Sequence, residues 1–330
     1  MNISNFFNTY PGMYITQAFF HSLIAAIIVD RSIQAWKISN PLIKQRFRFI
    51  VIVFPIFSFP VFQLINPDRG SISFRLEALF DANRWLNLEL WEKIPVSLLF
   101  ILILFITTLV FILQEVIPIL MHTIESKKST FEGERPDDDS IVYKALNSLP
   151  VEKPDVFIID DDEFILFSTT GSKAVIFLST GLVNELNIEQ LQAALAHEIA
   201  HITRSKRPLI LLIFLLRILM FFNPVVLIDF RRVVQEDEKI CDDIAISLTQ
   251  KPHALSEALR TLYYTTEGLN PAQTQKLSNL RTSIEEYSHH LLIESRIKRL
   301  EQGPVYNTGG EWFKFILTLI VIIVINYFVV

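Results

Sequence analysis

Four stretches of this chain contain no Asp, Glu, Lys or Arg and are long enough, or nearly long enough, to cross a bilayer. A helix needs about 20 apolar residues for that crossing, and about 17 is the lower limit. We place three spans at about 11–29, 49–67 and 94–120. A fourth, at 313–330, includes Phe313 and the stem of Lys314, which extend a shorter uncharged run. The sequence therefore predicts a membrane α-helical protein with four transmembrane helices.

The basic residues of the short loops set the predicted orientation. The segment between the first two spans has no acid after Asp30 and contains Arg31, Lys37, Lys44, Arg46 and Arg48. Because such loops stay in the cytoplasm, we expect this loop there and the amphipathic loop 68–93 outside. Within the outer loop, residues 76–91 are predicted to form one amphipathic helix that lies on the membrane surface. Residues 121–312 then form one cytoplasmic domain between the third and fourth spans.

The cytoplasmic region combines helices with a small sheet. It opens on a polar linker, and residues 140–149 have the pattern of an amphipathic helix. Three β-rich runs follow, DVFII, EFILFS and KAVIFLS, separated by the turn signals DDD and TTGS. We expect an antiparallel sheet in which segment 173–180 is an edge strand that pairs with an extended substrate. The single cysteine, Cys241, excludes a disulfide framework and a cysteine-based zinc site.

The motif H-E-x-x-H occurs at His197, Glu198 and His201. Asn187 and Gln190 form a capping-box pattern before it, and apolar residues recur at helical spacing. The two histidines are therefore one turn apart on one face of a helix, where two neutral imidazoles can bind one Zn²⁺. Glu198, beside the first ligand, can act as general base on a zinc-bound water.

A third ligand has to come from downstream, where FRRVVQEDEKICDDIAISL has helical periodicity. Glu238 and Asp242 lie one turn apart in it. Glu238 can complete a His–His–Glu site, and Asp242 can accept the free ring N–H of a ligand histidine. Ligand chemistry favours Glu238 and leaves Glu236 as the alternative. We expect Glu236, Asp237 and Asp243 otherwise to form a solvated acidic face.

These residues resemble a known family. The order FLSTGLVNELNIEQLQAALAHEIAH, then an apolar stretch that ends in Asn-Pro, then E-x-x-C-D is similar to that of the BlaR/MecR-type bacterial membrane metallopeptidases, which are gluzincins. The four-span layout fits as well. The resemblance implies that His197, His201 and Glu238 bind one Zn²⁺ per chain, that Glu198 is the catalytic base and that Asp242 supports a ligand histidine. It also implies an α+β zincin-like (gluzincin) cytoplasmic domain. The HtpX and CAAX-protease group is the nearest rival.

The sequence departs from that family at one point. The antibiotic sensors carry a penicillin-binding domain after their last span, whereas this sequence stops at Val330. The resemblance therefore gives no support for β-lactam sensing by acylation. We expect a protease module whose trigger the sequence does not identify.

A long apolar segment, 208–228, follows the motif helix. A single crossing would put Glu238 about 30 Å from His197 and His201, although the ligands of one zinc ion each lie about 2 Å from it. Basic residues flank the segment on both sides, which favours both ends being cytoplasmic. We therefore expect the segment to be re-entrant or packed against the spanning helices, with Arg217 snorkelling or facing a polar partner.

Together these features predict an integral-membrane, zinc-dependent endopeptidase of the cell (inner or plasma) membrane, with its active site on the cytoplasmic side. Its partners would be the lipid bilayer and a cytosolic or membrane-proximal protein or peptide substrate, such as a repressor cleaved in regulated signalling. With a net charge of −5, a nucleic-acid partner is not indicated. An HtpX-like quality-control protease and a non-catalytic membrane signalling scaffold are the alternatives, although Glu198 argues against a scaffold. The sequence is also compatible with a homo-oligomer.

Overall fold

The structure is a computed structural model that describes residues 6–90, 94–117, 133–169, 174–205, 208–264, 292–303 and 310–330. The chain divides into two compact units. The first comprises Met1–Lys128, Leu209–Glu236 and Tyr306–Val330, and the second comprises Ser129–Pro208 and Asp237–Val305. The predicted end of the third span, 118–120, and most of the predicted linker, up to residue 132, lie outside the described residues.

Long apolar helices make up most of the first unit. α2 (Tyr10–Ala35) packs against α3 (Pro41–Ile65), and α6 (Val96–Phe111) runs on into the π-helix η2 (Ile112–Val116). In the described part of the chain, three helices are long and apolar enough to cross a membrane: Tyr10–Ala35, Pro41–Ile65 and Val96–Val116. The membrane character predicted from the sequence is thus confirmed.

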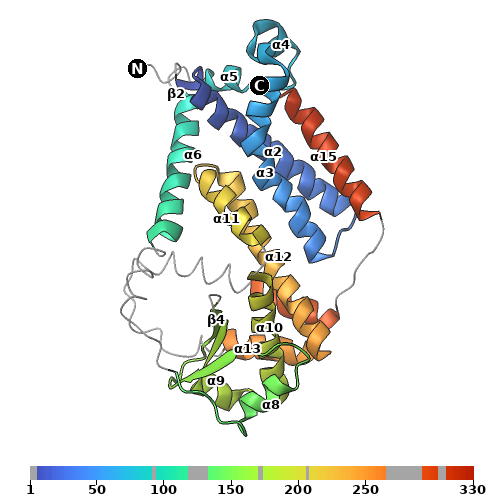
Figure 1. Ribbon diagram of the computed structural model, residues 1–330. Helices are drawn as coiled ribbons and strands as arrows, with labels where there is room; N and C mark the ends of the chain where they lie inside the picture. The colour runs from blue at the N-terminus through green and yellow to red at the C-terminus, as the bar shows by residue number, and fades with distance from the viewer. Residues whose placement is uncertain are drawn as a thin grey trace. The chain divides into compact units, whose positions relative to one another are not determined.

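The fourth apolar stretch forms α15 (Glu311–Tyr327), which packs against α2 and α3 (Figure 1). Ile322 of α15 joins Ala25, Val29, Phe47 and Val51 in one buried cluster. The helix has 17 residues, about the lower limit for a crossing, so the fourth span stays a prediction.

α2 and α3 extend beyond the uncharged stretches that marked them in the sequence. Nothing in residues 30–35 breaks a helix, so α2 continues through them. Asn40 caps α3 by accepting a hydrogen bond from the N–H of Leu42 at 2.9 Å, and Pro41 occupies the first helical position. The basic residues of the predicted loop therefore lie mostly on helix ends.

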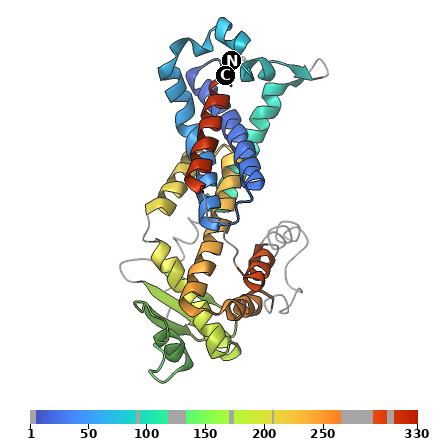
Figure 2. The ribbon, with the colours of Figure 1, turned by 90° about the vertical axis from the view of Figure 1, so that its right-hand side faces the viewer.

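Residues 76–90, the described part of the predicted surface helix, do not form one helix. α4 (Ile72–Glu77) and α5 (Ala82–Leu86) are separate, and the C-terminal end of the chain lies beside them (Figure 2). Phe80 forms a β-bridge with Val329, and Asp81 caps α5 by accepting from the N–H of Arg84. The predicted helix is interrupted because Phe80 pairs with the C-terminal segment. The hydrophobic periodicity of residues 76–91 does not reveal that pairing.

The apolar segment 208–228 forms a helical hairpin. α11 (Pro208–Leu219) leads into a turn at residues 220–223, and α12 (Pro224–Thr249) leaves it. The ring centroids of Phe214 and Phe230 lie 6.4 Å apart, so the two helices fold back on each other. Ile213 and Val226 pack with residues of α2 and α3 in a buried cluster.

Ion pairs hold the hairpin within the first unit. Arg217 of α11 is buried and pairs with Glu115 of η2. Asp229 of α12 is also buried, and its carboxylate lies 2.6 Å from Arg48 of α3. Arg48 in turn lies 3.1 Å from Asp30 of α2. Charged side chains inside an apolar helix bundle need such partners, because an unpaired charge there is costly.

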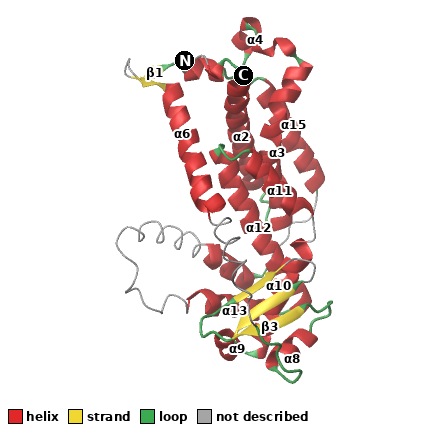
Figure 3. Cartoon of the chain, turned by 60° about the vertical axis from the view of Figure 1, so that its left-hand side comes forward, coloured by secondary structure: helices red, strands yellow, loops and turns green. Residues whose placement is uncertain are grey.

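The second unit contains a three-stranded sheet (Figure 3), formed by β3 (Asp155–Ile159), β4 (Leu166–Thr169) and β5 (Val175–Ser179). The strands lie in the order β3-β5-β4. β4 pairs with β5 antiparallel, but β3 pairs with β5 parallel. The prediction of an antiparallel sheet was therefore wrong. So was the prediction that 173–180 is an edge strand, because β4 takes one side of β5 and β3 takes the other. Glu134 forms a bridge with Ile158 on the far side of β3.

α10 (Ile188–Ser205) is the central helix of the second unit and packs against α8 (Ile141–Asn147) and α13 (Pro252–Tyr264). α9 (Thr180–Glu185) links β5 to it, and a further helix covers 292–302. Leu191 and Leu195 of α10 are fully buried in the main core cluster, together with Leu255 and Ile297. Burial of this apolar face orients the rest of α10.

Candidate metal centre

α10 positions both histidines of the H-E-x-x-H motif. Its capping box is formed, because Gln190 Oε1 accepts from the N–H of Asn187 at 2.9 Å while Asn187 Oδ1 accepts from the N–H of Gln190 at 3.0 Å. Downstream on the same helix, His197 and His201 share one face, with their Nε2 atoms 3.0 Å apart.

α12 brings Glu238 to the same place. Its two carboxylate oxygens lie 3.6 Å from His197 Nε2 and 3.5 Å from His201 Nε2, respectively. Ligand atoms of a tetrahedral zinc ion, each about 2.0–2.1 Å from it, lie about 3.3 Å from one another. With one ligand atom from each side chain, the three atoms all lie within 4.8 Å of one another, and two imidazoles with one carboxylate are ordinary zinc donors. The three side chains therefore fit one zinc ion.

The other acids of this stretch make different contacts. Glu236 is buried and does not join the group of potential ligands found among the described residues. Asp237 accepts from Arg204 of α10 at 2.8 Å, and Asp243 accepts from Arg299 at 2.6 Å. The prediction of a solvated acidic face was therefore wrong, because basic partners that are distant in sequence pack against α12.

Two consecutive residues of α12 contact the ring Nδ1 atoms. His197 Nδ1 lies 3.1 Å from Asp242 Oδ1, and His201 Nδ1 lies 3.5 Å from Cys241 Sγ. These contacts orient the imidazoles so that both Nε2 atoms face Glu238. Burial raises the pKa of the Cys241 thiol, which keeps the sulfur protonated in the metal-free protein.

Arg296, in the helix 292–302, is a residue of this site that the sequence analysis missed. Its guanidinium donates to both oxygens of Asp242, at 2.8 and 2.6 Å, and lies 3.0 Å from Glu238 Oε2. Asp242 is fully buried, and a buried carboxylate needs such a partner. That need was the only available signal, and it does not single out one of the basic residues in SRIKRLEQG.

The charges of the site act on one another. Burial lowers the pKa of His197, but hydrogen bonds with Asp242 and Glu238 outweigh it and raise the pKa to about 9. Burial raises the pKa of Asp242, but Arg296 and His197 bring it down to about 2. The pKa of Glu238 falls well below its usual range, because hydrogen bonds with His197 and His201 outweigh its burial. Without metal, a proton on His197 balances this charge, and a metal cation would displace that proton.

A cleft of about 400 Å³ opens beside these side chains. Glu198, which is 8% exposed, lines it together with Tyr263 and Arg296. Its remaining walls are apolar and come from the start of β4 and from α13: Phe164, Ile165, Leu166, Leu255, Leu259 and Leu262. The arrangement combines a metal-binding group, a carboxylate beside it and an apolar-walled cleft.

Comparison with known proteins is consistent with this chemistry. The model of the family described as BlaR1 peptidase M56 matches residues 91–282, more than half of the chain. The chain is also similar to proteins named Protease HtpX homolog. One from Streptococcus equi subsp. zooepidemicus is 33% identical over 85 residues, which is 25% of this chain and 29% of that protein. One from Streptococcus agalactiae is 31% identical over 86 residues, again 25% and 29%. One from Streptococcus pyogenes is 33% identical over 85 residues, or 25% and 28%.

These similarities differ in extent. The match to the HtpX homologs spans less than a third of their length. It therefore indicates a related region and not similarity over the full length of the two proteins. The family match covers the third apolar helix, the motif helix and Glu238. The resemblance stated from the sequence is confirmed, and the chain belongs to the BlaR1 peptidase M56 family of membrane metallopeptidases.

Proposed function

We propose that the protein is an integral-membrane, zinc-dependent endopeptidase that cleaves cytosolic or membrane-proximal proteins in regulated signalling. His197, His201 and Glu238 bind the zinc ion, Glu198 is the general base, and Asp242 orients His197. One observation carries the proposal: two imidazole nitrogens and one carboxylate lie 3.0–3.6 Å apart beside a cleft that Glu198 also lines.

The side chains divide the chemistry of peptide hydrolysis among them. When bound, zinc supplies Lewis-acid activation of a water molecule and of the scissile carbonyl. Glu198 accepts the proton of the attacking water and passes it to the leaving amine. Asp242 accepts the Nδ1–H of His197 and so fixes the tautomer that leaves Nε2 free as a ligand. Arg296 holds Asp242 in place through two hydrogen bonds.

The substrate would add to β4 as a further strand. β5 has a strand on each side, whereas β4 is at the edge of the sheet. Residues 164–166, which lead into β4, line the cleft together with Glu198. Main-chain pairing along this edge would hold a peptide in extended form next to the general base.

Contacts in the first unit support a cytoplasmic location of the site. Arg232 of α12 lies 3.0 Å from Asp30 of α2, and Asp229 lies 2.6 Å from Arg48 of α3. α12 therefore returns to the end of α2 and α3 that carries the basic residues expected in the cytoplasm. Glu238 follows within the same uninterrupted helix.

The proposal is tested with Glu198→Gln, which should keep zinc and lose proteolysis. Comparison of the proteomes of cells that carry wild type or Glu198→Gln would identify the proteins that accumulate uncut. Glu189→Gln is a matched control, since Glu189 is an exposed glutamate near the start of the same helix. Undiminished cleavage by Glu198→Gln, or a loss equal to that of Glu189→Gln, would refute the role of the base.

A quality-control protease is the second candidate, and the similarity to the HtpX homologs favours it. The two functions differ in substrates. Regulated signalling predicts one or a few regulators cut at a defined bond after a stimulus, whereas quality control predicts many damaged membrane proteins. The spectrum of proteins that accumulate with Glu198→Gln separates them, and identical proteomes would indicate a non-catalytic scaffold.

A further inference from the structure

The segment between α3 and α6 contains a groove of about 510 Å³ that the proposed peptidase chemistry does not use. Residues of α4, of α5 and of the link between them form it, from Ile72 to Leu88. Its volume lies within the range for small-molecule sites, about 300–1,000 Å³. The groove is therefore large enough to hold a ligand.

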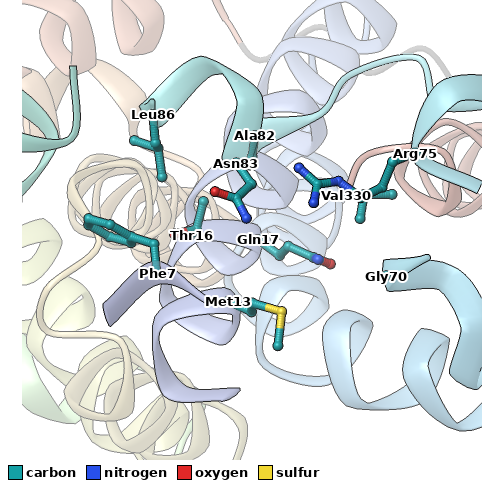
Figure 4. A pocket seen from close by; sticks show the side chains of 10 residues that line it. All are labelled: Phe7, Met13, Thr16, Gln17, Gly70, Arg75, Ala82, Asn83, Leu86 and Val330. Carbon is teal, nitrogen blue, oxygen red and sulfur yellow. The ribbon is translucent and has the colours of Figure 1, made fainter. Parts of the chain in front are cut away.

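α5 has a buried face and an open face. Figure 4 shows the buried face, where Ala82 and Leu86 lie beside a small cavity at the start of α2. That cavity, of about 40 Å³, has room for a few water molecules at most. The open face presents Arg84 and Trp85 to the larger groove. Packing of the buried face thus fixes the side chains that line the groove.

Contacts within the first unit hold the groove in shape. Arg75 of α4 donates to both carboxylate oxygens of Asp81, each at 2.9 Å, and so ties α4 to the start of α5. The ring centroid of Phe80 lies 4.8 Å from that of Phe20 on α2 and 5.8 Å from that of Trp85. A preformed site binds a ligand at a lower entropic cost than a site that must first be ordered.

The walls of the groove are apolar side chains that face outwards. Ile72, Leu76 and Leu79 are 79%, 80% and 69% exposed, respectively, and Trp85 is also exposed. A contiguous apolar surface of this kind indicates a site of interaction with an apolar partner.

This apolar surface continues from a membrane helix. Leu64 and Ile65 are exposed at the end of α3, which is long and apolar enough to cross a membrane. α4 follows after the short turn η1 (Pro67–Gly70). Trp85 suits this level, because tryptophan is enriched where the apolar part of a membrane meets its headgroups. The partner of the groove is therefore a lipid chain of the surrounding bilayer.

Arg84 adds a positive charge at the groove. Its side chain is exposed, and among the described residues no carboxylate forms an ion pair with it. Asp81 is the only acid in the described lining, and Arg75 already binds it. A guanidinium matches a phosphate group, to which it can donate two hydrogen bonds at once.

We propose that this groove binds a phospholipid. One acyl chain lies along Ile72, Leu76 and Leu79, and the phosphate accepts hydrogen bonds from Arg84. The proposal concerns the first unit alone and does not rest on the peptidase function.

The test follows the fluorescence of Trp85 in the full chain, purified in a maltoside detergent, with Trp36, Trp91 and Trp312 replaced by phenylalanine. The probe is phosphatidylglycerol with brominated acyl chains, because bromine quenches tryptophan on contact. Quenching should saturate at one lipid per chain. Brominated diacylglycerol, which has the same chains and no phosphate, should bind more weakly.

Two substitutions locate the lipid, each with a matched control. Arg84→Gln should weaken phosphatidylglycerol binding about 5-fold, the effect of one basic residue near an anionic membrane surface. Arg31→Gln, at an exposed arginine of α2 outside the groove, should leave binding unchanged. Ala78→Phe places a ring in the groove and should abolish saturable quenching, whereas Ala35→Phe, at an exposed alanine of α2, should not. If Ala78→Phe does not fold, the comparison of Arg84→Gln with Arg31→Gln decides.

Three results would overturn the proposal. Quenching that rises with lipid and never saturates would mean that Trp85 meets only bulk lipid. Equal affinities for phosphatidylglycerol and diacylglycerol, or equal effects of Arg84→Gln and Arg31→Gln, would exclude a phosphate at Arg84. A dimer in light scattering that Ala78→Phe splits would mean that a second copy of the chain occupies the groove.

Discussion

Asn223 Nδ2 donates a hydrogen bond to Ser22 Oγ at 3.0 Å and so joins the turn of the α11–α12 hairpin to the middle of α2. The same Nδ2 lies 3.3 Å from Ala18 O, while Oδ1 accepts from the N–H groups of Val225 and Val226. One buried side chain therefore caps α12 and fixes how far the hairpin reaches along α2. The Asn-Pro pair of the sequence has a structural reason, since proline suits the first position of a helix.

Asn223→Ala should destabilise the protein by about 2–3 kcal/mol, because it removes a helix cap and buried interhelical hydrogen bonds. Ser22→Ala should cost about 1 kcal/mol, since Asn223 keeps its cap and its contact with Ala18 O. Denaturant unfolding of the purified protein in detergent measures both. Equal losses from the two substitutions would contradict a capping role for Asn223.

The ligand assignment predicts different metal contents for substitutions of neighbouring acids. Wild type should hold one zinc per chain. His201→Ala and Glu238→Gln should lose it, because two remaining protein ligands bind zinc poorly. Glu236→Gln should keep it, since Glu236 is outside the ligand group. Metal analysis after gel filtration checks all three, and loss of zinc from Glu236→Gln alone would move the assignment to that residue.

Cys241 and Asp242 should influence zinc affinity through the histidines. Asp242→Asn should weaken binding about 10–100-fold, because a weaker acceptor then faces His197 Nδ1. Cys241→Ala should weaken it less, because the Sγ–Nδ1 contact of 3.5 Å is long, and Cys241→Ser should restore affinity. Titration against a chromophoric chelator measures these values. If Cys241→Ser binds no better than Cys241→Ala, the thiol only fills space.

The sequence predicted best what is encoded locally. The motif helix follows from its own capping box, apolar periodicity and a proline after its end, so the position of α10 follows from neighbouring residues alone. The strand order of the sheet could not be predicted from neighbouring residues. β4 pairs with one side of β5, and β3 then pairs with the other side, which local sequence does not specify. The antiparallel prediction failed for that reason.

Partners that lie far apart in the sequence account for the other differences. Arg296 reaches Asp242 from a helix more than fifty positions downstream, and Arg204 and Arg299 turn expected surface acids into ion pairs. The expected surface helix 76–91 breaks where Phe80 pairs with Val329. Charge patterns predict that a buried acid has a partner, but they do not say which basic residue the fold brings to it.

The metal-free protein should lose stability as the pH rises above neutrality. Burial lowers the pKa of His197, but its hydrogen bonds to acids raise it from 6.5 to about 9. A raised pKa contributes stability that is fully present below about pH 6.5 and is lost as the pH rises through about 9, here about 3 kcal/mol. Denaturant unfolding of chelator-treated protein between about pH 6 and 10 measures it. His197→Gln should flatten the profile, and a wild-type profile that is already flat would contradict the shift.

Topology decides whether the proposed centre can exist in a membrane. The proposed zinc ligands on α10 and α12 lie within 3.6 Å of one another, so the intervening hairpin has to begin and end on one side of the bilayer. Single cysteines in a Cys241→Ser background test this at three exposed positions, Arg84, Arg231 and Gln302. A membrane-impermeant maleimide should label the Arg84 position in intact cells, because residue 84 comes after the end of α3 that is predicted to face the outside. The Arg231 and Gln302 positions should be labelled only after lysis, because basic residues resist translocation. Labelling of the Arg231 position in intact cells would mean that Glu238, which follows on the same helix, also lies on the outer side. A cytoplasmic zinc centre would then be excluded.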